Sequence, residues 1–302
     1  MLRSSNQSGF PLRSSPMDTI TLRAAATAVM ASFLFAAMGA TIKVASHQLD
    51  NEMLVFLRNL IGLLLILPLI WRMGLARIRT HRPGMHLLRS LTGLSAMYCF
   101  FYALAHLNLA EAMLLNYSAP LFIAVIAVLW LGEQITLTLF IALLCGFAGI
   151  ALILKPDTGI IAPAALVGSL AGLFAGIAMV SIRRMSDSEP PLRIVFWFSL
   201  ITTLVSAIPL LWHWQPPTTD TIAIMLLAGV FATGGQILLT RSYTLAPASR
   251  VGPYIYTSVL FAALMGWLFW HETLDAWALF GAILVCCSGI LAIRRNKPRG
   301  SA

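Results

Sequence analysis

Long apolar runs separated by short polar or Pro/Gly-rich breaks fill most of the sequence. A helix that crosses about 30 Å of hydrocarbon, at 1.5 Å per residue, needs about 20 apolar residues. Ten runs approach this length, so the pattern predicts an all-α integral membrane protein with ten transmembrane helices. The predicted ranges are 24–45, 54–73, 89–106, 109–131, 137–154, 162–182, 192–212, 220–240, 249–270 and 276–293.

The composition agrees with this prediction and narrows the expected partners. Only 10% of the residues are charged, whereas soluble domains carry about 25%. The net charge of +9 does not predict nucleic-acid binding, because the basic residues lie in turns between apolar runs. All four cysteines fall inside apolar runs and are interpreted as packing residues. We expect no metal and no cofactor. The expected partners are the lipid bilayer and a small-molecule substrate, with the chain as a monomer or homodimer.

The distribution of Lys and Arg predicts the orientation, because short loops rich in these residues stay in the cytoplasm. With the N-terminus inside, 17 of the 20 basic residues, Arg89 among them, fall in cytoplasmic segments. Only Lys43 and Lys155 fall on the opposite side. The pattern therefore predicts the bacterial inner membrane, with both termini cytoplasmic: a tail at 1–23 and a basic tail at 294–302.

The two halves of the chain are related to each other. Residues 34–36 recur at 173–175, and at the same offset of 139 Tyr117 matches Tyr256 and Glu133 matches Glu272. The repeats predicted from this are 24–154 and 162–293, each with five helices. Because five is odd, the second repeat must enter the membrane from the other face. Inverted repeats of this kind are typical of secondary transporters, whose site lies near the midplane between the repeats.

Several motifs resemble the EamA-type family of the drug/metabolite transporter superfamily. They are 101–104 (FYAL), 110–112 (AEA), 118–122 (SAPLF), 131–133 (LGE), 253–258 (PYIYTS) and His271-Glu272. The resemblance covers 24–293 and implies two inverted five-helix repeats that transport amino acids, other metabolites or drugs. Some relatives import S-adenosylmethionine. In the second half His271 replaces the family's glycine, which favours a structural role for that glycine.

Arg58 is the one charge placed well inside a predicted span. Such residues usually face protein or water, because a charge in hydrocarbon costs at least ~2.5–3.5 kcal/mol. One hypothesis is that Arg58 anchors a substrate carboxylate. The alternatives are that it snorkels to the outer headgroups or pairs with Glu111 or Asp50.

Further candidate substrate contacts lie at two matched polar stretches. Pro120 interrupts the backbone hydrogen bonds of its helix beside Asn116 and Tyr117, and Pro253 precedes a similar stretch. Paired interruptions are a pointer to a binding site, although small polar residues also serve helix packing. The eight predicted substrate-binding residues are Arg58, Tyr98, Asn116, Tyr117, Gln236, Tyr254, Tyr256 and Thr257.

No catalytic residues are predicted, and the chain is not expected to be an enzyme. Walker, dinucleotide-binding and nucleophile-elbow motifs are absent from the sequence, and a membrane-embedded enzyme would need clustered acids or histidines. No acidic residue lies in the middle of a predicted span, so facilitated diffusion is a simpler hypothesis than proton coupling, unless Glu111 titrates. The predicted function is secondary transport of amino acids or related zwitterionic or anionic metabolites by alternating access. The alternatives are an S-adenosylmethionine-type uptake carrier and a multidrug exporter.

Overall fold

The computed structural model describes residues 16–73, 78–131, 137–154, 163–185, 188–245 and 254–295. The first half contains α1 (Pro16–Ala45), α2 (Asn51–Met73), α3 (Pro83–His106), α4 (Leu109–Asn116), α5 (Ala119–Leu131) and α6 (Leu137–Leu154). The second half contains α7 (Pro163–Met185), α8 (Pro191–Ala207), α9 (Leu210–His213), α10 (Thr219–Leu245), α12 (Thr257–Trp270) and α13 (Ala276–Arg295).

Every predicted range overlaps one helix or one interrupted helix, and the largest corrections are at helix starts. α3 begins at Pro83, six residues before the predicted start at 89, and α1 begins at Pro16. Proline suits the first turn of a helix, where the backbone N–H groups lack intrahelical partners anyway. Glu133 and the start of the 249–270 range lie outside the described residues.

The bundle is apolar on the outside. Five helices (α1, α2, α3, α7 and α10) are long and apolar enough to cross a membrane. The remaining helical segments of ten residues or more are shorter and also apolar. Large hydrophobic side chains such as Trp71, Leu129 and Leu211 are exposed, which a soluble surface rarely tolerates in such numbers. This exterior matches a hydrocarbon solvent.

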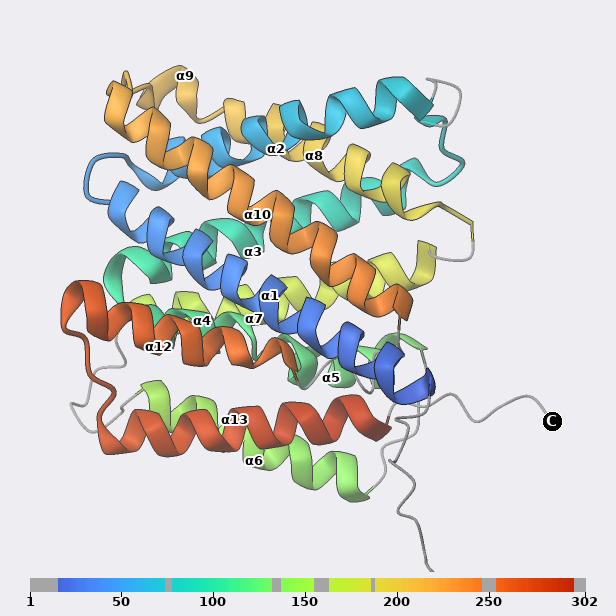
Figure 1. The fold of residues 1–302 in the computed structure, drawn as a ribbon, viewed down its shortest axis with the longest axis vertical. Coiled ribbons are helices and arrows are strands. Elements are labelled where there is room, and N and C mark those ends of the chain that lie inside the picture. Colours follow the sequence, from blue (N-terminus) through green and yellow to red (C-terminus); the bar gives the residue numbers. More distant parts are fainter. Residues whose placement is uncertain are drawn as a thin grey trace, which may run out of the picture.

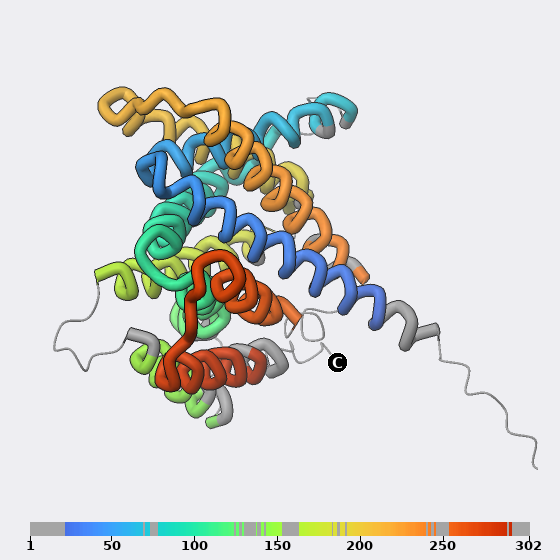
Figure 2. The backbone as a smooth tube through the Cα atoms, turned by 60° about the vertical axis from the view of Figure 1, so that its left-hand side comes forward, coloured from blue at the N-terminus to red at the C-terminus, as the bar shows by residue number. Residues whose placement is uncertain are grey.

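Helix pairing shows that the two halves are inverted copies of each other. α1 packs on α10 as α7 packs on α3, and α5 packs on α7 as α12 packs on α1. α2 with α8, α4 with α12, and α6 with α13 are pairs of equivalent helices. Turns 46–50, 107–108, 214–218 and 271–275 lie at one end of the bundle, and 78–82 and 188–190 at the other (Figure 1). α6 and α13 lie side by side, far from α2 and α8 (Figure 2).

Both halves contain a helix break that is held by equivalent hydrogen bonds. The Ser118 hydroxyl donates to the carbonyl of Leu115 at 2.6 Å, between α4 and α5. The Thr257 hydroxyl donates to the carbonyl of Tyr254 at 2.6 Å, before α12. The donor and the acceptor of the first bond, Ser118 and Leu115, each lie 139 residues before their counterparts in the second bond, Thr257 and Tyr254. Each hydroxyl therefore satisfies a carbonyl that the break would leave without a donor in hydrocarbon.

The opposite half covers each break closely. On α1, Ser32 donates to the carbonyls of Tyr254 and Ile255 at 3.2 and 3.3 Å. On α7, Gly172 lies so close to the first break that an added Cβ would be 2.8 Å from the Leu115 carbonyl oxygen. Glycine is required here because backbone approaches backbone, which confirms the packing role expected for small residues.

We expect Gly172→Ala to destabilise the protein by about 1–3 kcal/mol, because the new methyl group overpacks a site bounded by backbone. The measurement is the midpoint of thermal unfolding in detergent. Gly84→Ala is the matched control, since nothing lies within 4 Å of a Cβ at that position. Equal melting temperatures for the two variants would contradict the close contact.

Candidate functional site

Arg58 lies on α2 and points along its own helix, away from the Asn51 end. Its Nη1 donates to Asn59 Oδ1 at 3.2 Å and lies 3.9 Å from the position of a Cβ on Gly62, one turn further on. Asp50, one of the acids considered for pairing, instead accepts a hydrogen bond from Gln215. In the described part of the chain Arg58 has no ion pair with an acid. The hypothesis of an anion anchor stays a prediction.

Arg89 is a second arginine that packs against neighbouring helices. It lies within α3, six residues after the helix begins. Its guanidinium packs over the ring of Phe198 on α8, 4.1 Å from the centroid. Its Nε is buried without a hydrogen-bond partner. The late start predicted for this helix had left Arg89 at its edge.

Arg58 and Arg89 lie on α2 and α3, which pack against each other and against α8. Arg89 extends over Gly93, as Arg58 extends toward Gly62. A shared spacing of arginine and glycine four residues apart is the sequence signal that could have revealed the pair.

Buried polar atoms without partners concentrate on the same two helices. On α2 these atoms are Asn51 Oδ1 and Asn59 Nδ2; on α3 they are His86 Nδ1 and Nε2, Arg89 Nε, Ser90 Oγ and Tyr98 Oη. Buried polar groups nearly always have partners, so each exception needs an explanation. Seven such atoms on two adjacent helices identify this region as the candidate site, and Tyr98 is one of its predicted residues.

The other predicted site residues lie elsewhere, mainly at the two helix breaks. Tyr117 is the C-cap residue of α4, and α4 packs on α12. Asn116 is the last residue of α4, and Thr257 the first of α12. Tyr256 is buried, whereas Tyr254 is exposed. Gln236 on α10 is also exposed.

An ion pair closes one end of the bundle, here called the Lys43 end. Lys43 at the end of α1 pairs with Glu272 and also donates to the carbonyl of Leu107 at 2.6 Å. The other carboxylate oxygen of Glu272 accepts the N–H of Leu109, 2.7 Å away, at the N-terminus of α4. A carboxylate is favourable there because it complements the helix dipole. The sequence offered no sign of a contact between positions 229 residues apart.

The backbone conformation of His271 directs the next residue, Glu272, toward its contact with Lys43. It ends α12 in the left-handed conformation, with φ 54°, and is the one non-glycine residue with positive φ in the described ranges. The N–H of His271 donates to the carbonyl of Trp267 at 3.1 Å, which is the bond of an αL helix cap, and the N–H of Glu272 donates to the carbonyl of Gly266 at 3.1 Å. The structure thus gives the physical reason for a glycine at this position in the family.

Glu189 organises the opposite end, here called the Glu189 end. It is 2% exposed and accepts hydrogen bonds from Thr80 at 2.6 Å, Arg193 at 2.7 Å and the N–H of His81 at 3.3 Å. Burial alone would raise the pKa of this carboxyl group, but these donors outweigh burial and lower the pKa to about 2. His86 Nε2 lies 3.7 Å from the same carboxylate. The network ties the α2–α3 connection to the α7–α8 connection.

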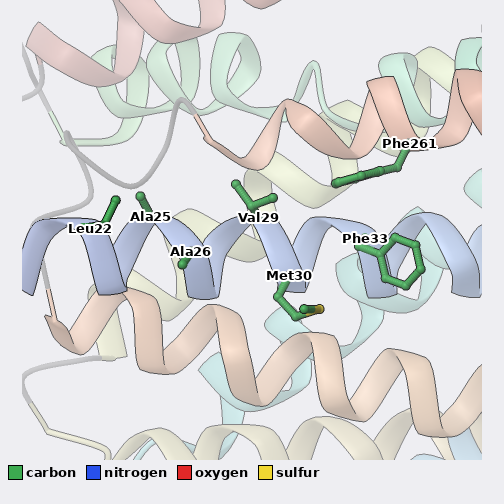
Figure 3. Close-up of a pocket in the computed structure, with 7 residues that line it drawn as sticks. All are labelled: Leu22, Ala25, Ala26, Val29, Met30, Phe33 and Phe261. Carbon is green, nitrogen blue, oxygen red and sulfur yellow. The ribbon is translucent and has the colours of Figure 1, made fainter.

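An apolar groove of about 570 Å³ lies between α1 and α12. Figure 3 shows its lining side chains, with Phe33 and Phe261 facing each other. Their rings meet edge to face at 5.4 Å. Without a polar side chain in its lining, the groove cannot orient a polar metabolite, so it is not the candidate site.

An apolar exterior, inverted repeats and buried polar groups that lack partners define a membrane transport protein of the inverted-repeat class. The model of the EamA-like transporter family matches residues 22–155 and again residues 162–294. The chain therefore belongs to this family, and the family's unit occurs twice in it.

Characterised relatives carry different small molecules. The chain is 38% identical to the pseudopaline exporter CntI of Pseudomonas aeruginosa, over 89% of this chain and 95% of that protein. It is 32% identical to a riboflavin transporter of Rhizobium johnstonii, over 77% of each. It is 24% identical to an S-adenosylmethionine uptake transporter of Rickettsia bellii, over 84% of this chain and 88% of that protein.

One solved crystal structure shares the fold, with a TM-score of 0.60 at 19% identity. The match covers 90% of this chain and 99% of the solved chain.

We expect Lys43 and Glu272 to be coupled energetically. Glu272→Gln should destabilise the protein by about 3 kcal/mol, because it leaves a buried ammonium group without its counter-ion. Adding Lys43→Met to that variant should cost much less than Lys43→Met alone. A double-mutant cycle on thermal unfolding in detergent measures the coupling. Additive effects of the two substitutions would show that the ion pair contributes nothing.

We expect the Glu189 network to make stability depend on acid pH. Because the pKa of Glu189 is lowered to about 2, its contribution is present above its ordinary pKa of 4.5 and is lost as the pH falls from there toward 2. The melting temperature of the unmodified protein should therefore fall more between pH 5 and 3 than that of Glu189→Gln. Parallel curves would exclude the network as the cause.

Proposed function

We propose that this protein is a secondary transporter that moves small carboxylate-bearing metabolites, such as amino acids or related zwitterionic or anionic solutes, across the bacterial inner membrane. The observation that carries the proposal is the group of unpartnered buried polar atoms on α2 and α3, the helices that carry Arg58 and Arg89. Family membership and relatives that carry small metabolites support transport. We retain ten crossings with both termini in the cytoplasm.

The proposed role of Arg58 is to bind the carboxylate of the solute. A guanidinium offers planar N–H donors that match a carboxylate in a two-pronged contact. Among the described residues no acid forms an ion pair with Arg58, so its charge is available to a solute. Binding would replace water around the solute with fixed donors on α2 and α3, which is what makes entry into a low-dielectric bundle tolerable.

Alternating access would use the inverted repeats. The structure has its Lys43 end closed by the Lys43–Glu272 pair, which joins α1 to the segment after α12 and, through Leu107 and Leu109, to the α3–α4 connection. Access from that end requires this pair to separate. Because the halves are equivalent in fold, the closed and open arrangements at the two ends differ by exchanging the roles of the halves.

Cationic cargo fits the site less well. S-adenosylmethionine carries a sulfonium, and lipophilic drug cations need an intramembrane carboxylate. The two arginines of α2 and α3 would repel a cation. Anionic and zwitterionic solutes are therefore the class that the charge of the site favours.

Counterflow in liposomes tests the function, with a panel of amino acids and organic acids. We expect uptake of at least one carboxylate-bearing solute, and we expect Arg58→Ala to weaken its half-saturation at least tenfold by removing the guanidinium. Arg72→Ala is the control, because Arg72 is exposed in the last turn of the same helix. Folding of each variant is verified by size-exclusion chromatography. Absence of counterflow for every solute with folded protein would refute the proposal.

A further inference from the structure

His86 is a buried titratable side chain at the Glu189 end, and no solute contact proposed above uses it. We propose that His86 is a proton sensor: a proton bound to its imidazole favours separation of the α2–α3 connection from the α7–α8 connection, and so opens the Glu189 end. The proton site itself does not depend on the solute. Its consequence for transport rests on the proposed function.

The imidazole of His86 is enclosed by protein but makes no hydrogen bond to the described residues. His86 is 1% exposed, and both Nδ1 and Nε2 are buried without a partner. Nε2 lies 3.7 Å from Glu189 Oε2, which is longer than a hydrogen bond. The ring of Trp197 on α8 is an aromatic neighbour, with 6.1 Å between the centroids. Because a neutral imidazole carries one donor and one acceptor nitrogen, the packed arrangement satisfies neither.

The carboxylate next to His86 already has a positive partner. Glu189 Oε2, the oxygen nearest to the imidazole, accepts a hydrogen bond from Arg193 Nη1 at 2.7 Å. Glu189 Oε1 accepts from the hydroxyl of Thr80 and from the N–H of His81. With its pKa lowered to about 2, Glu189 stays ionised at pH 5 and above. A proton on His86 therefore adds a second positive charge to a pair that is already balanced.

The surroundings of His86 offer an imidazolium little compensation. The other charged or titratable residues at this end, on α3 and on the elements packed against it, are basic: Arg82 and Arg89 on α3, Arg23 on α1, Arg72 on α2, Arg184 on α7, Arg193 on α8, and Arg79 and His81 in the α2–α3 connection. Glu52 and Glu111 lie in the first turns of α2 and α4, near the Lys43 end. Among the side chains described at the Glu189 end, Glu189 is the one acid.

These contacts fix the direction of the response. Burying a charge without a partner of its own is costly, so the closed arrangement disfavours a protonated His86. When the two connections separate, water solvates the imidazolium and the cost disappears. A ligand that binds one arrangement more tightly shifts the population toward it. Acid therefore favours opening of the Glu189 end, and the effect is absent at alkaline pH, where histidine is neutral in both arrangements.

The second repeat shows that the fold does not need an imidazole at this position. At the offset of 139 residues, Asp50 corresponds to Glu189, and Met225 on α10 corresponds to His86. Asp50 ties the connection before α2 to Gln215, as Glu189 ties the connection before α8 to Thr80. Met225 is fully buried, so an apolar side chain fills the equivalent place. His86 thus adds a titratable group to one of two equivalent ties.

The position of His86 favours sensing of pH over cotransport of protons. It lies in the first turn of α3, directly after the connection at 78–82. Water reaches it from the Glu189 end when that connection moves away. The proton therefore comes from the compartment that faces this end and returns to it, and none crosses the membrane with the solute.

Hydrogen–deuterium exchange of the purified full-length protein tests the sensor, because exchange reports local opening. The measured quantity is the protection of the backbone amides of residues 78–90, corrected for the intrinsic effect of pH on exchange. Peptides of α13, which packs mainly on α6, report any change in the protein as a whole. Between pH 8 and 5.5 we expect protection at 78–90 to fall at least about fivefold more than protection of α13.

Two substitutions assign the response to His86. His86→Met places in the first repeat the residue that the second repeat has at this position, and it should abolish the excess fall in protection. His81→Gln is the matched control and should retain the fall, because the exposed side chain of His81 takes no part in the network and its backbone N–H is kept. If His86→Met does not fold, His86→Gln supplies the comparison, since it is polar and does not titrate.

Three outcomes would overturn the sensor: equal changes at 78–90 and in α13, a response that survives substitution of His86, or a response that His81→Gln abolishes. Greater protection at acid pH would overturn its direction and with it the proposal. Any of these results together with counterflow of a solute leaves the transporter function standing. The expected exchange without counterflow supports the sensor and refutes the transport function, so the two failures are distinguishable.

Discussion

Hydrocarbon cannot hydrogen-bond to a polar atom, and this constraint accounts for most of the structure. It requires backbone groups to pair within helices. Where the chain breaks its helices, at Ser118 and before Thr257, it requires a local hydroxyl donor and a closely packed helix from the other half. The same constraint makes polar atoms that still lack a partner informative. In the described part of the chain, most of these atoms lie on α2 and α3.

The two repeats share a fold but differ in their chemistry. Their helix pairs and helix breaks are equivalent, and equivalence of this kind supports a carrier that can close at either end. The charged residues have diverged: Arg58 and Arg89 have no basic counterparts in the second half, where Phe198 instead covers Arg89. The two repeats thus combine a symmetric arrangement of helices with an asymmetric distribution of charged residues.

The sequence was sufficient for the framework because membrane helices are specified by length and apolar composition, which are local properties. The inverted repeat was visible in collinear matches such as Tyr117 with Tyr256. Helix starts were less predictable, because the first turns of α3 carry polar residues that resemble a loop, and this hid Arg89. The Lys43–Glu272 contact was invisible because it joins distant positions, and the predicted residues Gln236 and Tyr254 are exposed.

The ties at the two ends of the bundle have a mechanical consequence for α2 and α8. At the Lys43 end, Thr221 and Gln215 bind Gln48 and Asp50, which precede α2. At the Glu189 end, the residues before α8 hold the segment after α2. Hydrogen bonds thus tie the connections at both ends of the antiparallel helices α2 and α8. Separating these two helices would break bonds at both ends of the pair.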